Sequence, residues 1–120
     1  MPEFDKDEVR RFLRYFKEIA ASKGIYIVDR EKTDRTLIDL GINRAQCKDE
    51  IISLSVLDYS SGPDPDFSRP GAAPFWIFGK MVKGIEIYIK LKVVEGIARD
   101  RAICVSFHIA EESLYYPFNN

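Results

Sequence analysis

The chain has 120 residues, 46% of them hydrophobic, which is enough for one domain (residues 1–120) with one apolar core. The formal net charge of −1 argues against a generally basic nucleic-acid-binding protein. No apolar run approaches the roughly 20 residues of a membrane span, and the N-terminus lacks the apolar region of a signal peptide. We therefore expect a cytoplasmic protein with no membrane contact.

The first half of the sequence, about residues 1–58, is predicted to be mainly helical. Apolar residues between Asp5 and Ala21 recur at the spacing of one helical face, which indicates an amphipathic helix. The segment IYIV at 25–28 is typical of a short strand. Two shorter helices are expected to follow, the first ending at Gly41 and the second beginning after Asn43 and ending near Ser55.

Residues 59–74 have a different composition, because SSGPDPDFSRPGAAP contains four prolines and two glycines. Such a segment cannot sustain a helix or an interior strand, and it predicts a long loop. Structureless loops of this length are uncommon in compact domains and tend to bind ligands or to be disordered. We favour a loop on the substrate side of the domain.

From Phe75 to Ala110 the apolar residues alternate, which predicts an antiparallel meander of three strands: FWIFGKMV, GIEIYIKLKVV and AICVSFHIA. The middle strand would place Ile87, Ile89 and Leu91 on the core face and Tyr88, Lys90 and Lys92 on the other. In the last strand alternation places Ile103, Val105, Phe107 and Ile109 in the core and Cys104, Ser106 and His108 opposite.

The aromatic tail, residues 111–120 with LYYPF at 114–118, is expected to pack back over the sheet edge. The two cysteines, Cys47 and Cys104, lack the spacing of a metal site or a redox motif and are interpreted as reduced core thiols. The predicted fold class is α+β, with N-terminal helices packed on one face of a small antiparallel sheet.

The polar face of this sheet would carry the only histidine of the chain, His108, together with Tyr88, Lys90 and Ser106. Ammonium groups stabilise a phosphate, while histidine and tyrosine exchange protons. This combination suits cleavage of RNA by its own 2′-hydroxyl, a reaction that needs no metal or other cofactor. One histidine and two scattered cysteines do not predict a zinc site.

Aromatic side chains near this face could position a substrate on it. Trp76, Phe75 or Tyr59 could stack on the bases of single-stranded RNA. A lone histidine on a strand is, however, more often structural, so a binding module without catalysis stays open as an alternative. In that module the polar face and the proline-rich loop would engage a protein or a nucleic acid. A weaker alternative is an enzyme acting on a small anionic ligand.

Four stretches, LSVLDYSSGPDPD, FWIFGK, GIEIYIKLKVV and AICVSFHIAE, resemble the MqsR family of type II toxins, which are similar to RelE-like messenger-RNA interferases. The resemblance covers roughly residues 35–109. It implies a RelE-like fold, metal-independent cleavage of mRNA, either free or on the ribosome, and neutralisation by a cognate antitoxin protein in the cytoplasm.

The resemblance also implies roles for individual residues. Tyr88 and Lys90 match the tyrosine and lysine of the family's middle strand, and His108 stands at its basic position after Ser-Phe, where it would act as the acid. Two family positions differ, because a glutamine is replaced by Ile77 and a lysine corresponds loosely to Ser60 or Ser61. The predicted catalytic residues are Tyr88, His108, Lys90 and Lys80, and the predicted substrate-binding residues are Trp76, Lys92, Tyr59 and Ser106.

Overall fold

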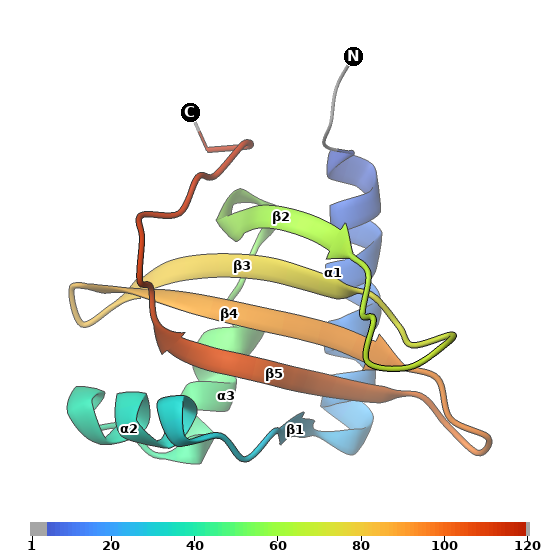
Figure 1. Ribbon diagram of the computed structural model, residues 1–120, viewed down its shortest axis with the longest axis horizontal. Helices are drawn as coiled ribbons and strands as arrows, with labels where there is room; N and C mark the ends of the chain where they lie inside the picture. The colour runs from blue at the N-terminus through green and yellow to red at the C-terminus, as the bar shows by residue number, and fades with distance from the viewer. Residues whose placement is uncertain (1–4, 120) are drawn as a thin grey trace.

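The computed structural model describes residues 5–119 (Figure 1). Its helical elements are α1 (Lys6–Lys23), α2 (Glu31–Leu40), α3 (Arg44–Ile52) and the 3-10 turn η1 (Val56–Asp58). The strands are β1 (Ile25–Ile27), β2 (Tyr59–Asp64), β3 (Phe75–Val82), β4 (Ile85–Val94) and β5 (Arg101–Ile109). They form one sheet in the order β1-β5-β4-β3-β2, which confirms the predicted α+β class.

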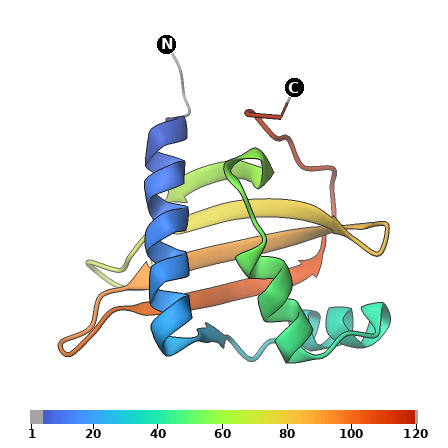
Figure 2. The same cartoon turned by 180° about the vertical axis from the view of Figure 1, so that it is seen from behind.

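The sheet has two unlike faces. Helices α1 and α3 cover one of them, called the helix face below, as Figure 2 shows. The other, called the open face, points towards the viewer in Figure 1 and carries no helix. No helix among residues 5–119 is long and apolar enough to cross a membrane.

Helix α1 begins and ends where its sequence predicts. The carboxylate of Asp5 accepts hydrogen bonds from the backbone N–H groups of Asp7 and Glu8, at 3.0 and 3.1 Å, and so caps the first turn. The helix ends at Gly24, whose φ of 81° favours glycine. Its buried residues are Val9, Leu13, Phe16 and Ile19, at the predicted helical spacing.

The antiparallel meander of β3, β4 and β5 is confirmed, with Ile87, Ile89 and Leu91 fully buried on the helix face. The sheet as a whole is mixed, because β1 runs parallel to β5 with Ile25 opposite Ala102. Our expectation of a purely antiparallel sheet is therefore corrected. Three residues between two helices predict a strand, but nothing in them fixes its direction or its partner.

The predicted loop over residues 59–74 is partly wrong, because residues 59–64 form the edge strand β2. Proline is tolerated at a sheet edge, where one side of the strand has no neighbour that needs its N–H group. Pro63 lies in this edge strand, and the pairing with β3 shifts register on both sides of Ser61. The remaining loop comprises residues 65–74.

A β-bulge in β5 changes the predicted alternation. Lys90 pairs with Ser106 whereas Leu91 pairs with Cys104, which leaves Val105 as an extra residue. Before the bulge the faces are exchanged, so Cys104 is buried in the core and Ile103 lies opposite Lys92. The predicted faces of Cys104 and Ile103 are therefore wrong, because one inserted residue shifts the period-two pattern by one position.

The C-terminal tail packs back over the sheet, as its composition predicts. The phenol of Tyr116 donates a hydrogen bond to Glu86 Oε2 at 2.6 Å. The Phe118 ring stacks on Tyr59 at 5.4 Å between centroids. Gly79 makes this approach possible, since a Cβ there would overlap Leu114 and the Tyr116 hydroxyl.

We expect both cysteines to be unreactive in the folded protein. Cys47 and Cys104 are fully buried, and burial raises the pKa of the Cys47 thiol to about 12 and also raises the pKa of the Cys104 thiol. Because the thiolate is the nucleophile, 5,5′-dithiobis(2-nitrobenzoic acid) at pH about 8 should label both thiols only after unfolding in guanidinium. Rapid native labelling of Cys104, identified with a Cys47→Ala variant, would place Cys104 on the open face and contradict the bulge.

Candidate functional site

Four of the predicted site residues lie together on the open face. Tyr88 and Lys90 of β4 pair directly with His108 and Ser106 of β5. The Tyr88 and His108 rings stack, with centroids 4.8 Å apart and 17° between their planes. Cross-strand neighbours on one face of a sheet interact in this way. The unbroken alternation of β4 and the residues after the bulge in β5 thus produce a compact polar row.

The hydrogen bonding of His108 defines which of its nitrogens can exchange a proton. Its Nδ1 lies 2.9 Å from the carbonyl oxygen of Ile109. A carbonyl oxygen only accepts hydrogen bonds, so Nδ1 carries a hydrogen and donates it. The other nitrogen, Nε2, is therefore the atom that takes up or releases a proton, while the stack on Tyr88 holds the ring plane.

Tyr88 remains a hydrogen-bond donor at neutral pH. Burial raises the pKa of its phenol above the ordinary value, and the negative charge of Asp64 raises it further. Both effects disfavour the phenolate. Tyr88 and His108 therefore supply different chemistry to the same spot, a phenol that keeps its proton and an imidazole that can accept one.

Lys90, Lys92 and Phe75 form a second group at one end of this row, called the lysine cluster below. The Nζ atoms of Lys90 and Lys92 lie 4.0 and 4.5 Å from the centroid of the Phe75 ring, a cation–π geometry. Lys92 also forms an ion pair with Asp66 of the loop at 2.8 Å. The Lys92 and Asp66 side chains are only 8% and 12% exposed, so this pair is largely shielded from water.

Asp66 ties the loop to the open face through both of its oxygens. Oδ2 accepts from Lys92 and Oδ1 accepts the N–H of Ser68 at 2.9 Å. The hydrogen bond from Lys92, together with those from Ser68, holds the pKa of the Asp66 carboxyl well below its usual range. Lys92 is thus already neutralised, which the sequence-based assignment to substrate binding did not anticipate.

The predicted site residues Trp76, Tyr59 and Lys80 are not on the open face. The Trp76 ring stacks on Phe12 of α1, with centroids 4.6 Å apart and 14° between the planes. Tyr59 is buried in the core. Lys80 forms an ion pair with Glu50 of α3 at 2.7 Å.

These three assignments are corrected, and Lys80 cannot supply charge to Tyr88 and His108 from the opposite side of the sheet. For Trp76 and Lys80 the physical reason is that β3 is apolar on both sides, so its alternation did not show which residues face the helices. For Tyr59 it is that residues 59–64 form the edge strand β2, which places its ring in the core. Phe75 and Ile77 are the residues of β3 that accompany Lys90 on the open face.

Two acidic residues of the site were missed. They are Asp64, whose charge raises the pKa of the Tyr88 phenol, and Asp66, which forms an ion pair with Lys92. The signal in the sequence is the pair of carboxylates in the DPD segment at 64–66, together with the lysine-rich strand at 85–94. The loop at residues 65–74 and the C-terminal tail lie at opposite ends of the sheet, in front of its open face (Figure 1).

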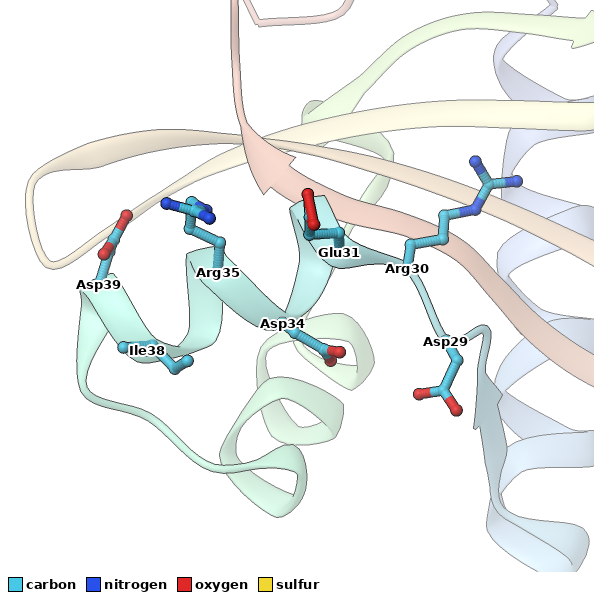
Figure 3. A pocket seen from close by; sticks show the side chains of 7 residues that line it. All are labelled: Asp29, Arg30, Glu31, Asp34, Arg35, Ile38 and Asp39. Carbon is cyan, nitrogen blue, oxygen red and sulfur yellow. The ribbon is translucent and has the colours of Figure 1, made fainter.

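A separate shallow cavity of about 570 Å³ lies at α2, outside the polar row (Figure 3). Arg44 binds two of its carboxylates, those of Asp29 and Asp34, each at 3.0 Å. The cavity is lined by Asp29, Arg30, Glu31, Asp34, Arg35, Ile38 and Asp39. This lining carries four carboxylates and two guanidinium groups, and it brings no histidine, tyrosine or lysine together.

Within residues 5–119, no group of three or more His, Cys, Asp or Glu side chains is arranged to hold a metal ion. No protein-family model, curated protein or solved structure matches the chain. The chemistry of the open face and the resemblance of its motifs therefore remain as the indications of function.

We expect the Asp66–Lys92 ion pair to make the free energy of unfolding depend on pH in the acid range. Because the folded state lowers the pKa of Asp66, its contribution is present above the unfolded value of about 4 and is lost as pH falls further. Urea unfolding of wild type and Asp66→Asn from about pH 7 to pH 2 should show a difference in free energy of unfolding that shrinks below about pH 4. A difference that is constant with pH would contradict the ion pair.

Proposed function

We propose that the protein is an endoribonuclease that cleaves mRNA at the open face without a metal, as the toxin of a type II toxin–antitoxin system. The observation that supports this proposal most directly is the stacked pair of Tyr88 and His108 beside Lys90. These three side chains provide a proton acceptor, a proton donor and a positive charge. Those are the groups that cleavage by the 2′-hydroxyl requires.

The proposed reaction assigns one step to each side chain. His108 Nε2 accepts the proton of the 2′-hydroxyl, whose oxygen attacks the adjacent phosphorus. The bond from phosphorus to the 5′-oxygen breaks, and that oxygen takes the proton of the Tyr88 phenol. The products are a 2′,3′-cyclic phosphate and a 5′-hydroxyl, and both side chains return to their starting states by exchange with water.

This assignment makes His108 the base rather than the acid that the family resemblance implied. Two contacts favour the change. The Ile109 carbonyl orients Nε2 for accepting a proton, and the carboxylate of Asp64 disfavours ionisation of the Tyr88 phenol. Lys90 would stabilise the charge that develops on the phosphate oxygens in the transition state. Ser106, directly opposite Lys90, would donate a hydrogen bond from its hydroxyl to the same phosphate.

The proposed partners follow from the family resemblance. Messenger RNA is the proposed substrate, with or without the ribosome, and a cognate antitoxin would bind the protein and block cleavage. The motifs that carry the resemblance include the Tyr88, Lys90 and Ser106 positions of the open face. Expression of the protein alone should therefore arrest growth, and coexpression of its antitoxin should relieve the arrest.

The acid–base pair can be tested with purified protein and a long single-stranded RNA in excess chelator. We expect His108→Ala and Tyr88→Phe each to lower the cleavage rate about 10²-fold or more, because each removes one proton-transfer step. Tyr26→Phe is the matched control, since Tyr26 lies on β1 and is half exposed. Equal rates in all four proteins would show that the cleavage comes from a contaminant.

The proposed action of the Lys90 ammonium on the scissile phosphate can be tested separately. Lys90→Met should lower the cleavage rate about 10²-fold, because its ammonium is proposed to act in the transition state. Lys48→Met on α3 removes the same charge at a distant place and should leave the rate unchanged. A similar loss in both variants would indicate a general charge effect and contradict the assignment of Lys90.

A binding module without catalysis is the second candidate. It is favoured by the neutralised Lys92 and by the carboxylates of Asp64 and Glu86, which reduce the positive potential of the open face. Under this alternative wild type would leave the RNA intact, also with translating ribosomes present. His108 would then be a structural residue held by Tyr88 and by the Ile109 carbonyl.

A further inference from the structure

The lysine cluster holds two positive charges but only one described anion. Both ammonium groups approach the Phe75 ring, at 4.0 and 4.5 Å from its centroid. Two like charges in such a small region repel each other unless anions are near. Among residues 5–119, Asp66 forms an ion pair with Lys92, whereas no ion pair is formed by Lys90. The Lys90 ammonium, without an ion pair in this part of the chain, therefore suits a further oxyanion.

The end of β2 and the loop that follows it place two carboxylates along the same row as these lysines. Asp66 binds Lys92 at 2.8 Å, and the charge of Asp64, two residues earlier, acts on Tyr88. On β4, Tyr88, Lys90 and Lys92 lie on one face, with about 7 Å between successive residues of this set. A nucleic-acid strand lying on the open face would present a comparable row of oxyanions, its phosphates.

We propose that Lys90 and Lys92 form a phosphate-binding site for a single nucleic-acid strand, and that the Asp66 carboxylate occupies this site in the free protein. Binding of the strand displaces Asp66 and lifts the loop, residues 65–74, from the open face. This inference rests on the proposed function in taking an RNA strand as the natural ligand. It adds a subsite for the phosphate next to the reacting one, with Lys90 lying between the two phosphates, and a contact that competes with the substrate.

The exchange is chemically balanced, because one oxyanion replaces another at the same ammonium group. A phosphate oxygen gives Lys92 a charge-assisted hydrogen bond of the same kind as the one from Asp66. The phosphate can also approach Lys90. Among residues 5–119, the Asp66 carboxylate pairs with Lys92, and Lys90 forms no ion pair. The bond from the Ser68 N–H to Asp66 lies within the loop and can move with it.

The loop is attached loosely enough for such a movement. Its residues from Phe67 to Gly71 are exposed, and the Phe67 side chain is 90% exposed. Within residues 5–119, the ion pair between Asp66 and Lys92 joins the middle of the loop to the sheet. Displacement of this one carboxylate would therefore release the loop without disturbing the core.

The test uses binding of a single-stranded DNA oligonucleotide, which has no 2′-hydroxyl and cannot be cleaved by the proposed reaction. We expect Asp66→Asn to lower its dissociation constant roughly fivefold or more at low salt, because the competing carboxylate is removed. The slope of log K against log salt should stay the same, since Lys92 neutralises the same phosphate in both complexes once Asp66 is displaced. Fluorescence anisotropy over a salt series measures both.

Two controls isolate the site from a general change in charge. Glu95→Gln removes one negative charge just after β4 without releasing a lysine, and it should change the dissociation constant much less. In the Lys92→Met background Asp66→Asn should have no effect, because its target is gone. Equal effects of Asp66→Asn and Glu95→Gln, or an undiminished effect in the Lys92→Met background, would overturn the proposal.

The outcome for this site is separable from the outcome for catalysis. If RNA remains intact but Asp66→Asn tightens DNA binding as described, the phosphate site stands and the nuclease proposal fails. If wild type cleaves RNA while Asp66→Asn changes neither DNA binding nor kcat/KM, the phosphate site is overturned and the nuclease proposal stands. Asp66→Ser, whose hydroxyl can still accept the Ser68 N–H, replaces Asp66→Asn if that variant unfolds.

Discussion

The extra residue at Val105 is the constraint on which the two-faced sheet depends. Side chains of a strand alternate strictly, so an uninterrupted β5 cannot point both Cys104 and Phe107 towards the helices. The bulge removes this conflict: Cys104 and Phe107 both enter the core, and His108 faces Tyr88 across the strand pair. The bulge therefore allows the N-terminal half of β5 to pack in the core while the other end of the strand contributes to the polar row.

The core in turn makes the polar row rigid. The open-face residues of β4 alternate with Ile87, Ile89 and Leu91, which are fully buried against the helices. Side chains on strands that are packed on one side keep a better-defined geometry than side chains on loops. The parallel ring stack of Tyr88 and His108 is a contact that a flexible backbone would not maintain. The loop at residues 65–74 supplies charge to this fixed surface and is attached to it by side-chain contacts.

Much of this arrangement could be predicted from the sequence, and the failures have definite physical causes. Helical spacing identified the buried face of α1, and the alternation of β4 placed Tyr88 and Lys90 together, because both patterns are regular. The bulge could not be predicted from the sequence, because the residues on either side of it are apolar or small. In β3 both faces are apolar, so the position of Trp76 depends on packing against Phe12, a contact distant in sequence. The role of Asp66 likewise depends on a partner 26 residues away.

The two edges of the sheet influence how any other protein can associate with this one. An exposed, straight edge strand invites pairing with a strand of another chain. Here one edge is β1, only 3 residues long, and the other is β2, which contains Pro63 and two register shifts. Neither edge offers a long run of unpaired backbone groups for such pairing. Short and irregular edges favour recognition through side-chain surfaces, and they also protect the chain against edge-to-edge aggregation.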